Sequence, residues 1–154
     1  MGLKQVEIYS DGACSGNPGR AGIGVVIKCG QKVIWEYSQP IGTTTNNVAE
    51  YTAAIYGLQQ ALILRAETVV LYTDSELFAR QICGVYRVKH PNIKFLFALI
   101  QHLKTGFRQF RVEHLPREGN KDADRLAKQS IKTERPKAVA LELFSGEESP
   151  SSKG

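Results

Sequence analysis

The sequence has few cysteines and no long apolar segment, and both absences exclude classes of protein. Its three cysteines, Cys14, Cys29 and Cys83, are odd in number and lack metal-ligand spacing, which argues against a disulfide framework or a zinc site. No apolar run approaches the ~20 residues that cross a bilayer, and the first residues lack the apolar core of a signal peptide. We therefore expect a cytoplasmic protein without a membrane partner.

The chain also lacks a Ser–His–Asp or Cys–His set of the kind used in covalent catalysis. The isolated His114 is expected to be packed or hydrogen-bonded within a strand. Acidic residues are fewer than basic ones, 15 against 20, which gives a net charge of +5. This excess favours a polyanionic partner such as nucleic acid, although a generically basic soluble protein has the same balance.

The length of 154 residues predicts one domain with a hydrophobic core of its own. We place this domain at residues 1–132 and expect it to be a monomer. Residues 133–144 form a C-terminal extension whose apolar end could dock as an added strand or a short helix. Residues 145–154 are rich in Ser, Gly and Glu and are expected to be a disordered tail.

The pattern of apolar residues predicts an α/β fold. Three antiparallel strands come first, at 4–10, 21–29 and 32–39, and two further strands follow at 67–73 and 109–115. The glycine-rich stretch 11–19 is expected to be a loop. Helices are expected at about 48–64, 76–84, 93–104 and 121–132.

Two of the expected strands end in an aspartate. The apolar run before Asp74 and the run before Asp11 are both of strand length, so parallel pairing of the two strands would bring the carboxylates together at one edge of the sheet. Asp74 could equally be an ordinary N-cap of the helix that follows it.

Two further acidic residues have sequence positions that turn them inward. Glu50 lies in a stripe of small residues on the helix at 48–64, which favours close packing against a sheet over exposure to water. In the last helix, Asp124 shares a face with apolar residues, whereas Asp122 lies beside Lys121 and Arg125 and is expected to face solvent. Both aspartates could also simply complement the helix dipole.

Convergence of Asp11, Glu50, Asp74 and Asp124 would place several negative charges within a few ångströms, which folding alone does not favour. A hard divalent cation with oxygen ligands would relieve the repulsion, and Mg²⁺ suits carboxylates combined with water and phosphate oxygens. Two such ions roughly 4 Å apart would stabilise the attacking and leaving oxygens of a phosphoryl displacement. Attack by metal-activated water would also explain why no nucleophilic side chain is present.

Four segments of the chain resemble type 1 ribonuclease H. They are residues 9–13 (YSDGA) with 16–19 (GNPG), residues 45–50 (TNNVAE), residues 72–75 (YTDS) and residues 120–127 (NKDADRLA). The resemblance extends from about residue 4 to residue 132. Each motif alone is weak, but their order and separations together make the resemblance specific.

The resemblance implies a mixed five-stranded sheet flanked by helices, and endonucleolytic cleavage of the RNA strand of an RNA–DNA hybrid with 5′-phosphate and 3′-hydroxyl ends. It implies that Asp11, Glu50, Asp74 and Asp124 bind two Mg²⁺ ions in the presence of substrate, with Mn²⁺ as another suitable ion. Double-stranded RNA is a further candidate substrate. The residues expected to contact the substrate are Gly12, Cys14, Asn17, Thr45, Asn46, Asn47 and Ser75.

The chain departs from well-studied bacterial members in two ways. Only 50 residues separate Asp74 from Asp124 and none is tryptophan, so the basic handle insertion that grips the DNA strand is absent, as in a compact branch of the family. Basic residues at 87, 89 and 94 could replace part of that grip. The loop before the last helix holds no histidine, and Arg117 is the candidate there for the side chain that assists product release.

Two other functions remain open at this point. One is a DNA nuclease of the same fold, such as a resolvase or an integrase-like enzyme. The other is a module that binds hybrids or double-stranded RNA without cutting them. The asparagines before Glu50 suit reading of a 2′-hydroxyl and argue against the first, and the complete set of four carboxylates argues against the second.

Overall fold

The computed structural model describes residues 3–132 and 137–138. The elements in chain order are β1 (Gln5–Gly16), β2 (Gly19–Cys29), β3 (Lys32–Thr44), α1 (Asn46–Ile63), β4 (Thr68–Thr73), α2 (Glu76–Ile82), α3 (Pro91–Leu103), η1 (Lys104–Gly106), β5 (Gln109–His114), η2 (Arg117–Asn120), α4 (Lys121–Ile131) and β6 (Lys137–Ala138).

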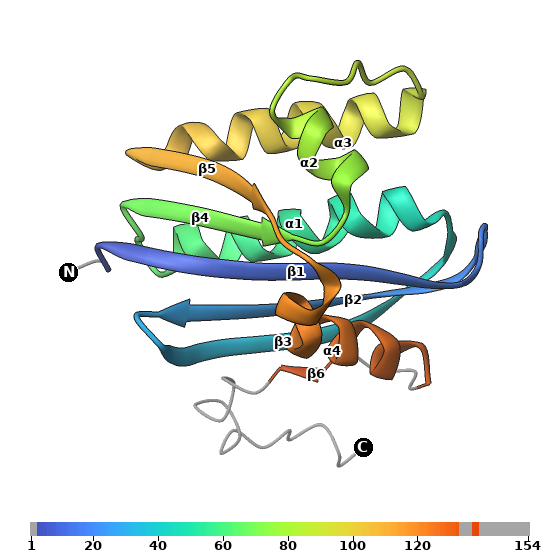
Figure 1. Ribbon diagram of the computed structural model, residues 1–154, viewed down its shortest axis with the longest axis horizontal. Helices are drawn as coiled ribbons and strands as arrows, with labels where there is room; N and C mark the ends of the chain where they lie inside the picture. The colour runs from blue at the N-terminus through green and yellow to red at the C-terminus, as the bar shows by residue number, and fades with distance from the viewer. Residues whose placement is uncertain (1–2, 133–136, 139–154) are drawn as a thin grey trace, which may run out of the picture.

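One mixed sheet with the strand order β5-β4-β1-β2-β3-β6 forms the middle layer of the fold. The pairs β1–β2 and β2–β3 are antiparallel, whereas β4 pairs in parallel with both β1 and β5. Helices α1 and α3 lie behind the sheet and α4 lies in front of it (Figure 1). The predicted α/β architecture, three antiparallel strands followed by parallel ones, is therefore confirmed.

The hydrophobic core fills the space between the sheet and helices α1 and α3. Its largest fully buried side chains include Tyr51 and Leu58 of α1, Ile8 of β1 and Leu71 of β4. Leu and Ile side chains at these positions each contribute about 1.5–3 kcal/mol by leaving water. Helix α1 packs against β1 and β2, so it is held against the strand that carries Asp11.

Glycines on the sheet let α1 and α4 approach it closely. A methyl group at Gly12 would lie 2.5 Å from the carbonyl carbon of Ala49 in α1. A methyl group at Gly24 would lie 2.5 Å from the backbone nitrogen of Ala127 in α4. Real side chains do not approach so closely, so these two positions fix how near each helix comes to the sheet.

Replacing Gly24 by alanine should lower the free energy of unfolding by at least about 2 kcal/mol, because the added methyl group would push α4 off β2. Urea unfolding followed by circular dichroism measures the change. Gly119→Ala is the matched control, since its methyl group would meet only Leu115 side-chain atoms at 3.6 Å or more. A loss of stability for Gly24→Ala no larger than for Gly119→Ala would contradict this account of α4 packing.

The first strand and its neighbours are longer than the sequence pattern predicted. The expected loop at 11–19 is wrong, because β1 continues through Asp11 to Gly16 and pairs with β2 over that length. The strand expected to end at residue 39 runs on to Thr44. Glycine-rich composition suggested a loop, but here the glycines lie in strands and make room for helices.

The two ends of the sheet differ from expectation in smaller ways. His114 is exposed at the end of β5, so the expected packing of this side chain is wrong. The start of the C-terminal extension does dock on the sheet, since β6 pairs antiparallel with β3 at Tyr37 and Ser38. Residues 139–144 of the extension and the expected disordered tail at 145–154 lie outside the described residues.

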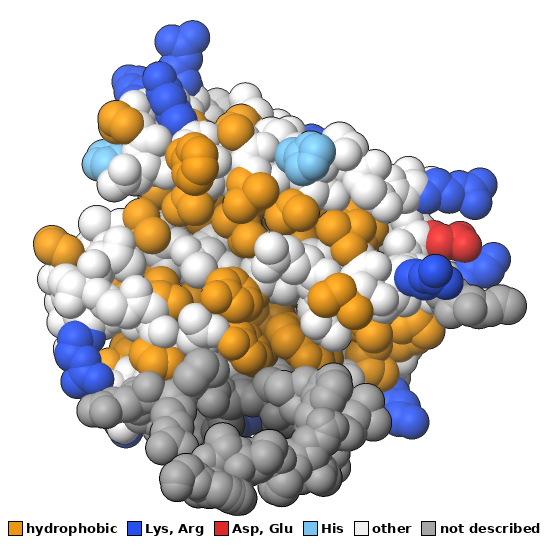
Figure 2. Space-filling model, turned by 180° about the vertical axis from the view of Figure 1, so that it is seen from behind, with side chains coloured by type: hydrophobic (Ala, Val, Ile, Leu, Met, Phe, Trp, Pro, Cys, Tyr) orange, Lys and Arg blue, Asp and Glu red, His pale blue; other side chains and the backbone are white. Residues whose placement is uncertain are grey.

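Figure 2 shows the face formed behind the sheet, where hydrophobic side chains gather across the middle and Lys and Arg stand at the periphery. Large exposed apolar side chains include Ile63 at the end of α1 and Phe95 on α3. Within the described part of the chain, no helix combines the length and apolarity that a membrane crossing requires.

Candidate active site

Parallel pairing of β1 and β4 places two aspartates side by side. Tyr9 of β1 is in register with Tyr72 of β4, and their rings stack with centroids 4.8 Å apart. Asp11 and Asp74 each come two residues later, so both side chains project from the same face as the tyrosines. The predicted juxtaposition is confirmed, although Asp11 lies within its strand and only Asp74 follows the end of one.

Helix α1 brings Glu50 to the same place from the other side of the sheet. The helix begins after Thr45, whose hydroxyl oxygen accepts a hydrogen bond from the Val48 backbone N–H at 3.2 Å, the arrangement typical of an N-cap. Gly12 is buried beneath α1, and its N–H donates a hydrogen bond to the Glu50 carboxylate. Glu50 is only 5% exposed, which confirms its predicted inward orientation.

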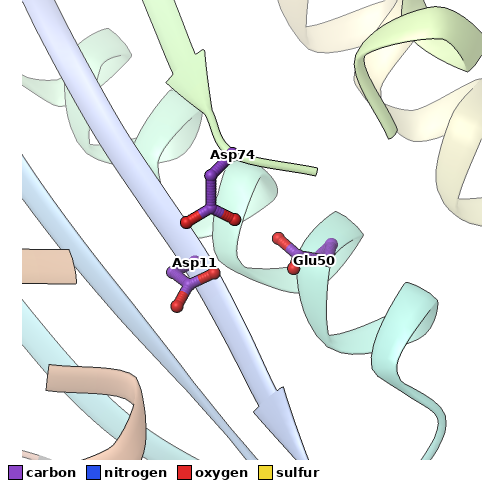
Figure 3. A group of neighbouring side chains, drawn as sticks. All are labelled: Asp11, Glu50 and Asp74. Atoms are coloured by element: carbon purple, nitrogen blue, oxygen red, sulfur yellow. The ribbon is translucent and has the colours of Figure 1, made fainter. Parts of the chain in front are cut away.

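Asp11, Glu50 and Asp74 form one acidic cluster. Each offers a carboxylate oxygen, and these three oxygens all lie within 4.8 Å of one another (Figure 3). Asp124 adjoins the cluster from α4 and shares a hydrogen bond with Asp11. Its Oδ2 also forms an ion pair with Lys128 Nζ at 3.1 Å. All four predicted carboxylates are therefore brought together.

Burial is the main reason that Asp11 and Glu50 resist ionisation. Burial, followed by the charges of Glu50 and Asp74, raises the pKa of Asp11 to about 10. Burial and then the charge of Asp74 raise the pKa of Glu50 to about 8, although the Gly12 N–H and the Arg117 guanidinium act in the opposite direction. Without a cation, Asp11 and Glu50 therefore favour their protonated forms at neutral pH.

Asp124 is in a different electrostatic environment. Partial burial raises its pKa, but hydrogen bonds from Asp11 and Lys128, together with the charges of Lys128 and Arg117, outweigh that effect and lower it. A hydrogen bond between two carboxyl groups needs a proton on one of them, and the opposite directions of the two pKa shifts favour Asp11 as the donor and Asp124 as the acceptor. Asp122 faces solvent and pairs with Arg125 at 3.7 Å, as predicted.

The cluster fits a hard divalent cation. All of its candidate ligand atoms are carboxylate oxygens, the donors that Mg²⁺ and Mn²⁺ prefer. Among the described residues, Glu50 Oε1 is buried without a hydrogen-bond partner. A buried polar oxygen left unpaired is costly, and coordination to a cation would satisfy it.

Comparison with known proteins places this geometry in a family. A family model described as "Reverse transcriptase-like" matches residues 9–130. The bifunctional protein Rv2228c of Mycobacterium tuberculosis is 41% identical over 129 residues, which are 82% of this chain and 35% of that protein. Ribonuclease HI of Halobacterium salinarum is 35% identical over 128 residues, 82% of this chain and 64% of that protein.

A solved structure agrees with these matches. LC11-RNase H1 in complex with an RNA/DNA hybrid superposes with a TM-score of 0.77 at 43% identity, covering 82% of this chain and 96% of that one. The chain belongs to the ribonuclease H family. It spans about a third of the length of the mycobacterial relatives and about two thirds of the haloarchaeal one.

Four of the predicted substrate-contact residues, Cys14, Asn17, Asn46 and Asn47, lie around the β1–β2 hairpin and the start of α1. Cys14 is half-buried and its thiol contacts the Thr44 carbonyl oxygen at 3.4 Å. Asn17, at the tip of the hairpin, accepts a hydrogen bond from the Asn46 backbone N–H at 3.0 Å. Asn46 itself is exposed. The hairpin is thereby tied to α1 beside the acidic cluster.

Two of the predicted contact residues have structural bonds of their own. Thr45 caps α1, and the Ser75 hydroxyl oxygen accepts a hydrogen bond from the Phe78 N–H at the start of α2. Ser75 directly follows Asp74 of the cluster in the chain, and Thr45 lies at the start of the helix that carries Glu50. Arg117 is exposed on η2, close enough for its charge to act on Glu50 and Asp124.

Sequence reasoning missed two polar residues that support the site. Gln81 of α2 is buried, and its Oε1 accepts hydrogen bonds from the Tyr51 hydroxyl at 2.9 Å and from Asn47 Nδ2 at 3.5 Å. The signal for Gln81 is its place on the apolar face of α2. Asn120 lies at the N-cap position of α4, but its side chain makes no capping bond and instead donates to the Ser10 carbonyl oxygen in β1.

We expect Asp124→Asn to lower the rate of hybrid cleavage by about ten-fold, and Asp122→Asn to leave it within two-fold. Asp124 lies beside the three-residue cluster, and Lys128 already offsets part of its charge, so its loss should cost less than the loss of a central ligand. Single-turnover cleavage of an end-labelled hybrid measures both variants. Equal losses for the two would contradict the assignment of Asp124 to the site.

Proposed function

We propose that this chain is a metal-dependent endoribonuclease that hydrolyses the RNA strand of RNA–DNA hybrids. The observation that carries the proposal is the convergence of Asp11, Glu50 and Asp74 within 4.8 Å, in a chain that belongs to the ribonuclease H family. A relative that is 43% identical has been solved in complex with an RNA/DNA hybrid, which supports the same class of substrate here.

Asp11, Glu50 and Asp74 would hold the cation, and Asp124 would complete the set on the side of α4. We propose Mg²⁺ as the ion, bound as a pair when substrate is present, with Mn²⁺ as a substitute. Bound divalent cations supply Lewis-acid stabilisation of the charge that develops on phosphate oxygens and lower the pKa of a bound water. The expected products carry 5′-phosphate and 3′-hydroxyl ends.

The chain's own residues prepare the site for that chemistry. Glu50 and Asp11 must release their protons before they can act as ligands, because burial otherwise keeps them protonated at neutral pH. The N–H of Gly12 holds the Glu50 carboxylate in place. Arg117 is exposed beside the cluster and is the residue we propose to move with the departing product.

Recognition of RNA would fall to the hairpin tip and the start of α1. Cys14, Asn17, Asn46 and Asn47 present thiol, amide and backbone groups in one region, and such short donors and acceptors suit a 2′-hydroxyl in a shallow minor groove. Gln81 fixes the Asn47 amide through the 3.5 Å bond. The hydroxyl groups of Thr45 and Ser75 are proposed phosphate contacts.

Several finer features complete the proposal. Double-stranded RNA is a second candidate substrate, because it presents the same 2′-hydroxyls. The three free cysteines suit a reducing compartment such as the cytoplasm. We propose a monomer as the active state.

The decisive experiment is cleavage of an end-labelled RNA–DNA hybrid in Mg²⁺ and in Mn²⁺. Double-stranded RNA, single-stranded RNA and double-stranded DNA of the same sequence are assayed in parallel, with Asp74→Asn as the site control. Hybrid-selective cleavage that disappears in Asp74→Asn would establish the proposed activity. Cleavage of DNA would assign the chain to the DNA nucleases of this fold, and binding without cleavage in either metal would make it a recognition module.

A further inference from the structure

The side chain of Asn120 connects the segments that carry the acidic cluster. Its Nδ2 donates one hydrogen bond to the Ser10 carbonyl oxygen at 3.0 Å and a second to Asp74 Oδ2 at 3.4 Å. Ser10 directly precedes Asp11 in β1, and Asp74 follows the end of β4. Asn120 itself lies at the end of η2, four residues before Asp124.

Both partners of this amide are hydrogen-bond acceptors, so a single group at this place must supply two donors. A primary amide meets that requirement, because its nitrogen carries two hydrogens. A hydroxyl group has only one hydrogen to donate, and an ionised carboxylate has none. Asparagine therefore suits this position because its Nδ2 can donate to both acceptors.

The side chain of Asn120 is buried, so its two hydrogen bonds are not surface contacts. The residue is 1% exposed, and its Oδ1 has no hydrogen-bond partner among the described residues. A buried amide with one half unsatisfied is costly. The donor half must contribute enough to offset that cost, and its two partners are β1 next to Asp11 and the carboxylate of Asp74.

We propose that Asn120 is a positioning residue that holds the Asp74 carboxylate in the orientation required for a divalent cation. The inference rests on the proposed function of the cluster as a metal site. By bonding β1 and Asp74 at once, Asn120 fixes the spacing between Asp74 and Asp11. It also anchors the start of α4, and with it Asp124, to the same point.

The test uses Asn120→Ala in the full chain, with Mg²⁺ alone as the probe. Isothermal titration should show Mg²⁺ binding roughly ten-fold weaker than in the original protein, in line with the usual effect of removing a group that orients a metal ligand. Steady-state cleavage of the hybrid should show a lower kcat with KM within two-fold. Asn120→Ser retains one donor, so its Mg²⁺ affinity and kcat should lie between those of the original protein and of Asn120→Ala. It replaces Asn120→Ala if that variant does not fold.

Ser38→Ala is the matched control for structural damage. The Ser38 hydroxyl donates to the Leu126 carbonyl oxygen at 2.7 Å and is buried, so it also ties α4 to the sheet, but it contacts none of the four carboxylates. Ser38→Ala should lower the Tm while leaving Mg²⁺ affinity and kcat unchanged.

The outcomes separate the two proposals. If both Asn120 variants lose stability but bind Mg²⁺ and turn over as the original protein does, Asn120 is structural and the inference is overturned. If the original protein binds Mg²⁺ and cuts no substrate, while Asn120→Ala weakens Mg²⁺ binding, the proposed activity fails and the positioning role stands.

Discussion

Replacing Asp11 by asparagine should reduce cleavage of the RNA–DNA hybrid at least about 10³-fold and, at the same time, stabilise the metal-free protein. The rate effect follows from the central position of Asp11 between Glu50, Asp74 and Asp124. Loss of a metal ligand at that position removes on the order of 4 kcal/mol of transition-state stabilisation, which corresponds to about 10³ in rate.

The stability effect has the opposite sign because the Asp11 carboxyl is unfavourable in the fold without a cation. Burial and two neighbouring carboxylates oppose its ionisation, and asparagine keeps the shape while removing the charge. We expect the free energy of unfolding in EDTA to rise by about 1–3 kcal/mol.

Chemical denaturation in EDTA and single-turnover cleavage in Mg²⁺ test the two halves of this prediction. Asp122→Asn is the control for removing one acidic charge outside the cluster, and it should change neither quantity appreciably. Cleavage by Asp11→Asn within ten-fold of the original rate would overturn the assignment of Asp11 as a central ligand.

The metal-free protein should lose stability as pH rises from about 5 to 9. The pKa of Asp11 rises from 3.8 to about 10 on folding, and that of Glu50 from 4.5 to about 8. The folded state therefore binds protons that the unfolded state has released. The stability that these two groups contribute below pH 4 is lost as pH rises toward their folded-state pKa values. The loss is on the order of 1 kcal/mol per pH unit for each group.

Mg²⁺ should reverse this slope. The cation binds the deprotonated carboxylates, so its stabilising effect grows as pH rises toward the folded-state pKa values. Thermal unfolding at several pH values, in EDTA and in saturating Mg²⁺, measures both slopes. Asp11→Asn should flatten the EDTA curve, and a Tm in EDTA that increases from pH 5 to pH 8 would refute the electrostatic account.

The sequence predicted the acidic cluster well because each carboxylate had a local signal. Glu50 lies in a stripe of small residues on a helix, and Asp74 directly follows an apolar strand. Asp124 could be told from Asp122 because helical spacing places the first beside apolar residues and the second beside cations. Periodicity determines which face of an element a residue occupies, and this information was enough to predict that these side chains converge.

The rest of the site could not be predicted because it depends on contacts between distant segments. The glycine-rich composition of residues 11–16 is typical of a loop. These residues nevertheless continue β1 because they pair with β2, and Gly12 leaves room for α1 to pack closely on the strand. Asn120 lies at the N-cap position of α4, but its Nδ2 donates to acceptors on β1 and Asp74, and in this orientation its Oδ1 makes no capping bond. The hydrogen bonds of Gln81 could not be predicted from neighbouring residues, because its partners Tyr51 and Asn47 are 30 or more residues away in the sequence.

The acidic cluster takes its members from the middle of β1, from α1 and from the turn after β4, and Asp124 joins it from α4 near the end of the domain. No partly folded intermediate that lacks α4 can present the complete set of carboxylates, so a cation finds its full site only after the last helix has docked on β2. Interactions that form after the transition state slow unfolding and leave the folding rate unchanged. In a magnesium-containing medium the domain should thus unfold more slowly, while its folding rate stays the same.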